Sequence, residues 1–183
     1  MKNKMKHQSK FLLYLLSLSL LLPLTSAHAN QDPYLSAQKN LSFSLYKPVN
    51  TLALKDPSLK ILPCGDGSKD WVSITYAQGS KSVEVMETSL GAHCSNPGLA
   101  KKLQNILINN VPAKLYLYCD PSNIKACTIS NFTKLGGYLL FSLPGYYKLK
   151  PVQLQLQASK GITYKELLLV ARSMTPASTK PSN

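Results

Sequence analysis

The sequence predicts an α+β domain: an antiparallel sheet of about five or six strands, with a C-terminal helix packed on it and two disulfides. Three observations lead to this fold class. Several segments alternate apolar and polar residues, which is the pattern of half-buried strands. The last apolar segment has helical spacing and begins at a capping box. Four cysteines follow an export signal, as in disulfide-bonded exported proteins.

Residues 1–29 are expected to be a signal peptide. Four lysines precede an almost uncharged apolar run, Phe11–Leu24, and Ala27-His28-Ala29 then forms an A-x-A cleavage signal. The run is shorter than the roughly 20 residues that a membrane-spanning helix needs, although an uncleaved anchor is the alternative. Cleavage after Ala29 would leave a single exported domain, 30–175, and a flexible tail, 176–183, in the periplasm or outside the cell.

The strand predictions rest on two-residue alternation. Val72–Tyr76 and Val83–Glu87 flank a turn at Gln78–Lys81, so these segments are expected to form a β-hairpin. Further strands are predicted at Ala113–Cys119, Tyr138–Leu143 and Val152–Gln157. The last of these has an apolar face and a face made of glutamines, so one side meets the core and the other meets water or a ligand.

Helical segments are expected at three places. A short helix fits after Asp32-Pro33, because proline is tolerated in the first turn. The apolar residues between Leu99 and Leu107 have helical spacing, which favours a short helix or an irregular linker. The final helix begins at Thr163, with Glu166 completing the capping box, and continues to about Met174.

The expected disulfides involve all four cysteines of the chain. Three pairings are possible. We favour Cys119–Cys127, because residues 120–126 form a turn, and Cys64–Cys94, because both lie in loops beside the hairpin. A zinc site usually contains closely spaced cysteine pairs, and the sequence has none, so neither a metal nor a cofactor is expected.

The charge balance is strongly basic, with 21 Lys+Arg, 8 Asp+Glu and a formal net charge of +13. Four lysines belong to the expected signal, so the exported part carries 17 basic residues, 16 of them lysine, and a net charge of +9. Proteins that read nucleic-acid sequence favour arginine, so no nucleic-acid partner is expected. Dispersed lysines suit an anionic envelope polymer, or they simply keep the protein soluble.

No motif in the sequence indicates a reaction. His93 is the one histidine of the exported part, and a G-x-S-x-G nucleophile elbow is absent. Glu84 and Glu87 are three residues apart, which places them on opposite faces of one strand rather than together as a catalytic pair. Asp66 and Asp70 lack the rest of a calcium loop. We therefore predict no catalytic residues.

The candidate binding residues lie on a face that carries lysine and tyrosine. Lys114, Tyr116 and Tyr118 alternate along one predicted strand, and Tyr138 begins the next one. Such a face could bind a glycan or a peptide through stacking, hydrogen bonds and charge. Tyrosine is also common in strands for its packing alone, which is the alternative.

Several segments taken together resemble a known family. They are the hairpin that begins with Trp71–Tyr76, then Ile108–Leu115 (INNVPAKL), Gly137–Phe141 (GYLLF) and Ile162–Ser173 (ITYKELLLVARS). The pattern resembles a small extracytoplasmic domain of unknown function found in bacterial anti-sigma regulators and lipoproteins. Asn110 stands where that family has glycine, and the four cysteines are additional. The resemblance implies a noncatalytic sheet that senses or binds.

These features predict an exported, noncatalytic bacterial envelope protein that binds a partner protein or an anionic envelope polymer. A small secreted hydrolase acting on the cell wall is one alternative. A secreted factor acting on host cells is the other.

Overall fold

The computed structural model describes residues 32–55, 57–65, 67, 68, 70–92, 94, 99–120 and 122–177, so the expected signal peptide, His93 and Asp66 lie outside the described residues. The helices are α1 (Pro33–Gln38), α2 (Phe132–Leu135) and α3 (Tyr164–Arg172), and two 3₁₀ turns are η1 (Ile124–Ala126) and η2 (Ile129–Asn131). The strands are β1 (Tyr46–Pro48), β2 (Ser58–Leu62), β3 (Trp71–Gln78), β4 (Lys81–Ser89), β5 (Lys101–Ile108), β6 (Val111–Leu117), β7 (Gly137–Leu143), β8 (Val152–Ala158) and β9 (Met174–Pro176).

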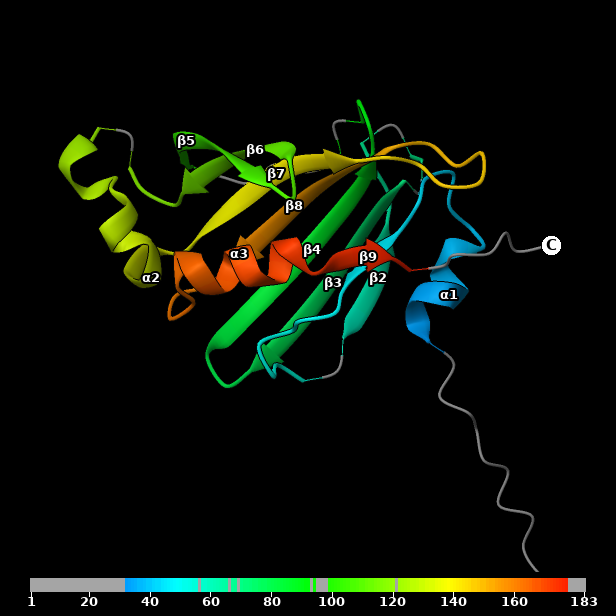
Figure 1. Ribbon diagram of the computed structural model, residues 1–183, viewed down its shortest axis with the longest axis horizontal. Coiled ribbons are helices and arrows are strands. Elements are labelled where there is room, and N and C mark those ends of the chain that lie inside the picture. Colours follow the sequence, from blue (N-terminus) through cyan, green and yellow to red (C-terminus); the bar gives the residue numbers. More distant parts are fainter. Residues whose placement is uncertain are drawn as a thin grey trace, which may run out of the picture. The chain divides into compact units, whose positions relative to one another are not determined.

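The predicted α+β class is confirmed, with an antiparallel sheet of seven strands rather than five or six. The strand order is β2-β3-β4-β8-β7-β6-β5, and a small second sheet pairs β1 with β9. The chain builds β2, β3 and β4, crosses to the far edge as β5, and returns through β6 and β7. Strand β8 then closes the sheet between β7 and β4. Figure 1 shows α3 lying across one side of this sheet.

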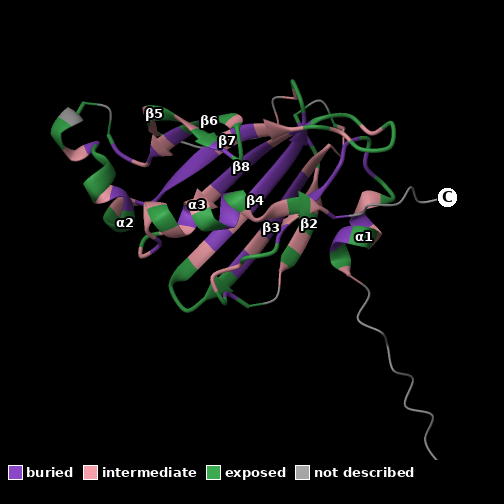
Figure 2. Ribbon diagram, in the orientation of Figure 1, coloured by how far each residue is buried: buried purple, intermediate pink, exposed green. Residues whose placement is uncertain are grey.

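The core lies between the sheet and the elements that cover this side. Val152, Leu154 and Leu156 of β8 are fully buried, as the alternation of that strand predicts. They belong to one cluster with Leu167 of α3 and with Phe43 from the segment after α1. Burying a side chain of this size contributes about 1.5–3 kcal/mol, so each of these residues stabilises the packing of α3 and the N-terminal segment on the sheet. Figure 2 shows the buried residues running along the central strands.

The C-terminal helix begins where its capping box predicts. The Thr163 hydroxyl accepts a hydrogen bond from the Glu166 backbone N–H (3.1 Å), and the Glu166 carboxylate accepts one from the Thr163 N–H (2.7 Å). The helix ends at Arg172, and the chain then pairs with β1 as β9. The Ala177 N–H donates to the Leu45 carbonyl (2.8 Å), so the first two residues of the tail expected at 176–183 are paired with the fold. Residues 178–183 lie outside the described residues.

The helix or linker expected between Leu99 and Leu107 is wrong, because Lys101–Ile108 forms the edge strand β5. A register shift between Lys102 and Gln104 interrupts the alternation of this strand. Such a bulge inserts an extra residue, so apolar positions fall three apart and imitate helical spacing. Asn109 and Asn110, with φ of 48° and 68°, then turn the chain into β6, as a tight hairpin turn requires.

The two expected disulfides are confirmed. Cys64 is bonded to Cys94, with a Cα–Cα distance of 4.7 Å, and Cys119 is bonded to Cys127, with a Cα–Cα distance of 5.7 Å. Two disulfides are typical of a chain that folds in an oxidising compartment. Within the described ranges, no helix is long and apolar enough to cross a membrane.

Candidate functional site

The residues predicted to bind lie on the side of the sheet that faces away from α3. We call this side the open face and define it by the side chains that alternate with the core residues along β3 to β8. Strand register brings its members together, since Lys114 is opposite Leu140 and Tyr116 is opposite Tyr138. The open face comprises Trp71, Ser73, Thr75, Ala77, Ser82, Glu84, Met86, Thr88, Lys102, Asn105, Leu107, Pro112, Lys114, Tyr116, Tyr118, Tyr138, Leu140, Ser142, Gln153, Gln155 and Gln157.

The three tyrosines of the predicted binding face form one packed cluster. The rings of Tyr116 and Tyr138 are stacked with their centroids 4.5 Å apart, and Tyr118 leans on Tyr138 at 5.7 Å. The Tyr118 hydroxyl donates a hydrogen bond to the Gln157 side chain. Burial raises the pKa of Tyr138 to about 12, and Tyr116 beside it adds to this effect. Tyr138 is only 4% exposed, so its ring supports Tyr116 and Tyr118 and is itself little available to a ligand.

The glutamines of β8 continue this cluster as a hydrogen-bonded polar layer. The side-chain amides of Gln155 and Gln157 both approach the sulfur of Met86 on β4. Beyond them, the Ser73 hydroxyl donates to the Glu84 carboxylate at 2.6 Å. Gln155 is 4% exposed although it lies on the polar face of its strand. The middle of the open face is therefore filled by its own side chains, and its accessible part lies toward β5.

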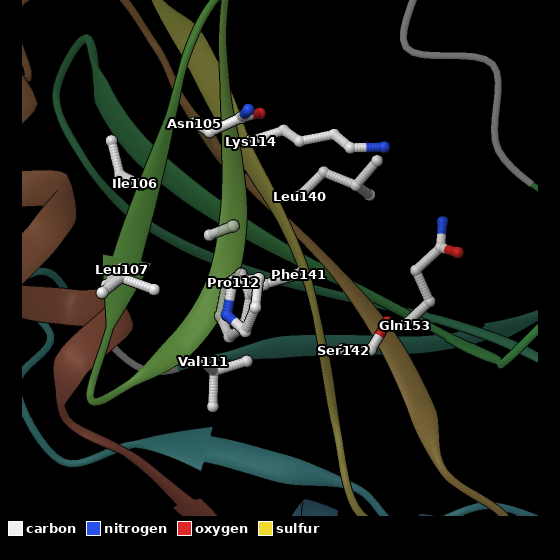
Figure 3. A pocket seen from close by; sticks show the side chains of 11 residues that line it. Asn105, Ile106, Leu107, Val111, Pro112, Lys114, Leu140, Phe141, Ser142 and Gln153 are labelled. Atoms are coloured by element: carbon white, nitrogen blue, oxygen red, sulfur yellow. The ribbon is translucent and has the colours of Figure 1, made fainter.

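A hollow of about 720 Å³ opens in that part of the face, over β5, β6, β7 and β8 (Figure 3). Its volume is in the range of ligand pockets, about 300–1,000 Å³. Side chains of both kinds line it: Leu107, Pro112 and Leu140 are apolar, and Asn105, Lys114, Ser142 and Gln153 are polar. Figure 3 shows Lys114 and Leu140 reaching toward the same side of the sheet, with Gln153 beyond them. Lys114 thus joins the hollow to the tyrosine cluster.

The electrostatic character of this region favours an anion. On the open face of β5, β6 and β7, the charged residues that the structure describes are Lys102 and Lys114. Both side chains are exposed, and Lys102 lies opposite Tyr116. The acidic residue of the open face, Glu84, lies on β4 and is engaged by Ser73. A ligand over the hollow therefore meets positive charge beside apolar surface.

The remaining titratable groups do not form a catalytic set within the described part of the chain. Glu84 and Glu87 point to opposite faces of β4, as predicted, because Glu87 is fully buried in the core. Burial raises the pKa of Glu87 well above its usual range, and one of its oxygens accepts a hydrogen bond from the Tyr46 N–H (2.9 Å). Cys94 is bonded to Cys64 and is not a free thiol. No cluster of three potential metal ligands occurs among the described residues.

Sequence reasoning found Lys114 but missed the apolar residues around it. Pro112 precedes Lys114 by two residues, and Leu140 follows Tyr138 by two, so alternation alone could have placed each on the same face as its neighbour. Alternation does not reveal Leu107, because the bulge in β5 gives its strand the spacing of a helix. The order β8-β7-β6-β5, which gathers these strands into one hollow, leaves no local signal in the sequence.

The fold and the site define a disulfide-bonded α+β protein with a basic, partly apolar hollow on the open face of its sheet. No protein-family model matches the chain, and neither a curated protein nor a solved structure matches it. The resemblance to the extracytoplasmic domain of anti-sigma regulators and lipoproteins therefore stays a prediction. The functional proposal rests on the chain's own residues.

Proposed function

We propose that this protein is an exported, noncatalytic bacterial envelope protein that binds a partner protein or an anionic envelope polymer through the open face of its sheet. Its location would be the periplasm or the cell exterior. Two disulfides support an oxidising compartment. The A-x-A motif ending at Ala29 supports export by a cleaved signal peptide.

The observation that carries the binding proposal is the hollow of about 720 Å³ beside Lys114. Ligand sites combine an apolar lining with a small number of polar groups, and this hollow has both. The excess of lysine over acidic residues supports an anionic partner, because opposite charge raises the rate of encounter and selects the partner.

The test is retention of bacterial envelope components by the immobilised, disulfide-bonded protein. We expect retention in about 0.01 M salt and its loss in about 1 M salt, because the screening length falls from about 30 Å to about 3 Å between them. Lys114→Glu should lose the retained component. Lys165→Glu makes the same change of charge on α3, on the other side of the sheet, and should keep it. Equal retention by the two variants would contradict the proposal.

A further inference from the structure

We propose that the hollow binds an extended acidic segment of a partner protein, with one apolar side chain inside the hollow and carboxylates on Lys114 and Lys102. This inference rests on the proposed binding function and names the chemical class of the ligand. Of the two anionic ligands, a peptide fits the hollow better than a polysaccharide. Three properties of the open face support that choice: its apolar surface, the spacing of its two charges, and its length.

The apolar surface of the hollow favours a peptide side chain. Leu107 is 61% exposed, Pro112 beside it is also exposed, and the register of β5 with β6 places the two directly opposite each other. Leu140 of β7 completes this surface. Covering exposed apolar area contributes roughly 25 cal/mol per Å². A leucine-like side chain gains this term, whereas a charged sugar polymer offers mostly hydroxyl and carboxylate groups.

The two cations have the spacing of alternate residues in an extended chain. Lys102 is opposite Tyr116, and Tyr116 is two residues from Lys114 along β6. Neighbouring strands are about 4.8 Å apart and two residues of a strand rise about 6.8 Å, so the two lysine positions are about 8 Å apart. Residues i and i+2 of an extended peptide are separated by about 7 Å. Carboxylates at every second position would therefore meet both lysines.

The length of the hollow sets the length of the segment. It crosses four adjacent strands, β5 to β8, and three strand spacings amount to about 14 Å. About four extended residues span that distance, and about two more reach Lys102, which lies beyond the hollow opposite Tyr116. Asn105, Ser142 and Gln153 along this path can exchange hydrogen bonds with the backbone of such a segment. The site is thus suited to a short linear motif with one apolar residue and two acidic residues.

The experiment is a titration of the intact protein with defined probes. The first probe is an eight-residue peptide with one leucine and two glutamates placed two positions apart. In a second peptide glutamines replace the glutamates, and in a third serine replaces the leucine. Polygalacturonate serves as the anionic polysaccharide. We expect the first peptide to bind at least about tenfold more tightly than the other two. The second peptide lacks the carboxylates that meet the lysines, and the third lacks the apolar side chain that enters the hollow.

Protein variants locate the binding. Lys114→Glu and Leu107→Ser should each weaken binding of the first peptide about tenfold, whereas Lys165→Glu on α3 should leave it unchanged. Lys114 and Leu107 are exposed, and equal far-UV circular dichroism of all variants would confirm that they fold. Binding of the first peptide that is the same in Lys114→Glu and Lys165→Glu would overturn the inference.

The polysaccharide arm separates failure of this inference from failure of the proposed function. If polygalacturonate binds in a way that depends on Lys114 and the first peptide does not bind, the peptide inference is wrong and the binding function stands. If no probe binds and the envelope extract yields no Lys114-dependent component, the inference and the proposed function both fail.

Discussion

Glu87 makes the stability of the folded protein depend on pH, and a single substitution should remove its contribution. This residue is fully buried on the core side of β4, where one carboxylate oxygen accepts the Tyr46 N–H and the other has no hydrogen-bond partner among the described residues. The hydroxyls of Tyr34, Tyr46 and Tyr76 interact electrostatically with Glu87, and burial raises the pKa of each of them. Burial therefore raises the pKa of Glu87 and favours the protonated carboxyl in the folded protein.

The size of the effect follows from proton linkage. An unfolded glutamate loses its proton above its pKa of about 4.3, whereas folded Glu87 keeps its proton because its pKa is raised. Above about pH 4.3 the unfolded state binds fewer protons, so raising the pH favours unfolding. The contribution of Glu87 to the free energy of unfolding falls by about 1.4 kcal/mol per pH unit until the folded pKa is reached.

Glu87→Gln removes this proton and keeps an oxygen that can accept the Tyr46 N–H. The assay is urea unfolding between pH 4 and pH 7, followed by the fluorescence of Trp71, the one tryptophan of the chain. Between about pH 4.3 and the raised pKa of folded Glu87, we expect the variant to gain stability relative to the wild type by about 1.4 kcal/mol per pH unit. Glu84→Gln makes the same substitution on the open face of the same strand. This variant should keep the wild-type decrease in the free energy of unfolding as the pH rises. If the free energies of unfolding of Glu87→Gln and the wild type changed in parallel with pH, a protonated Glu87 would be refuted.

Two further predictions concern the helix cap and the disulfides. Thr163→Ala should lower the free energy of unfolding by about 1 kcal/mol, because the first turn of α3 loses its capping acceptor. Thr163→Ser keeps a hydroxyl and should retain most of this stability. Equal stability of the two variants in urea would contradict the role of the cap. Loop-closure entropy gives about 3.6 kcal/mol for the Cys64–Cys94 bridge, which spans 30 positions, and about 2.5 kcal/mol for Cys119–Cys127, which spans eight. The double variant Cys64→Ser/Cys94→Ser should therefore unfold at a lower urea concentration than the double variant Cys119→Ser/Cys127→Ser. The reverse order would refute this reasoning.

Local signals in the sequence predicted most of the individual elements of the fold. The hairpin of β3 and β4, the strand β8 and the capping box at Thr163 each depend on residues close together in the chain, so alternation or capping chemistry reveals them. The disulfide partners could also be chosen, because turn and loop residues surround them. Strand β5 was missed because its bulge at Lys102–Gln104 replaces a spacing of two by a spacing of three.

The candidate site was only half predictable. Lys114 and the tyrosines share faces of strands that alternation identifies, but the burial of Tyr138 depends on stacking between two strands. The hollow requires that β5, the fifth strand in the chain, should lie at the edge of the sheet, three places from β8. The local β5–β6 hairpin places Leu107 next to Pro112, but only the order of the whole sheet brings Gln153 of β8 into the same hollow.

The claim that the open face is the binding surface can be tested most directly by mapping backbone and side-chain amide shifts on titration with the leucine–glutamate peptide. Asn105 and Gln153 carry side-chain amides at the two ends of the hollow and report on it independently of the backbone. We predict that the largest shifts fall on Asn105, Leu107, Lys114 and Gln153. In Lys114→Glu, the affinity obtained from these shifts should be about tenfold weaker. Shifts concentrated on α3, or the absence of any shift with every probe and with the retained envelope component, would contradict the claim.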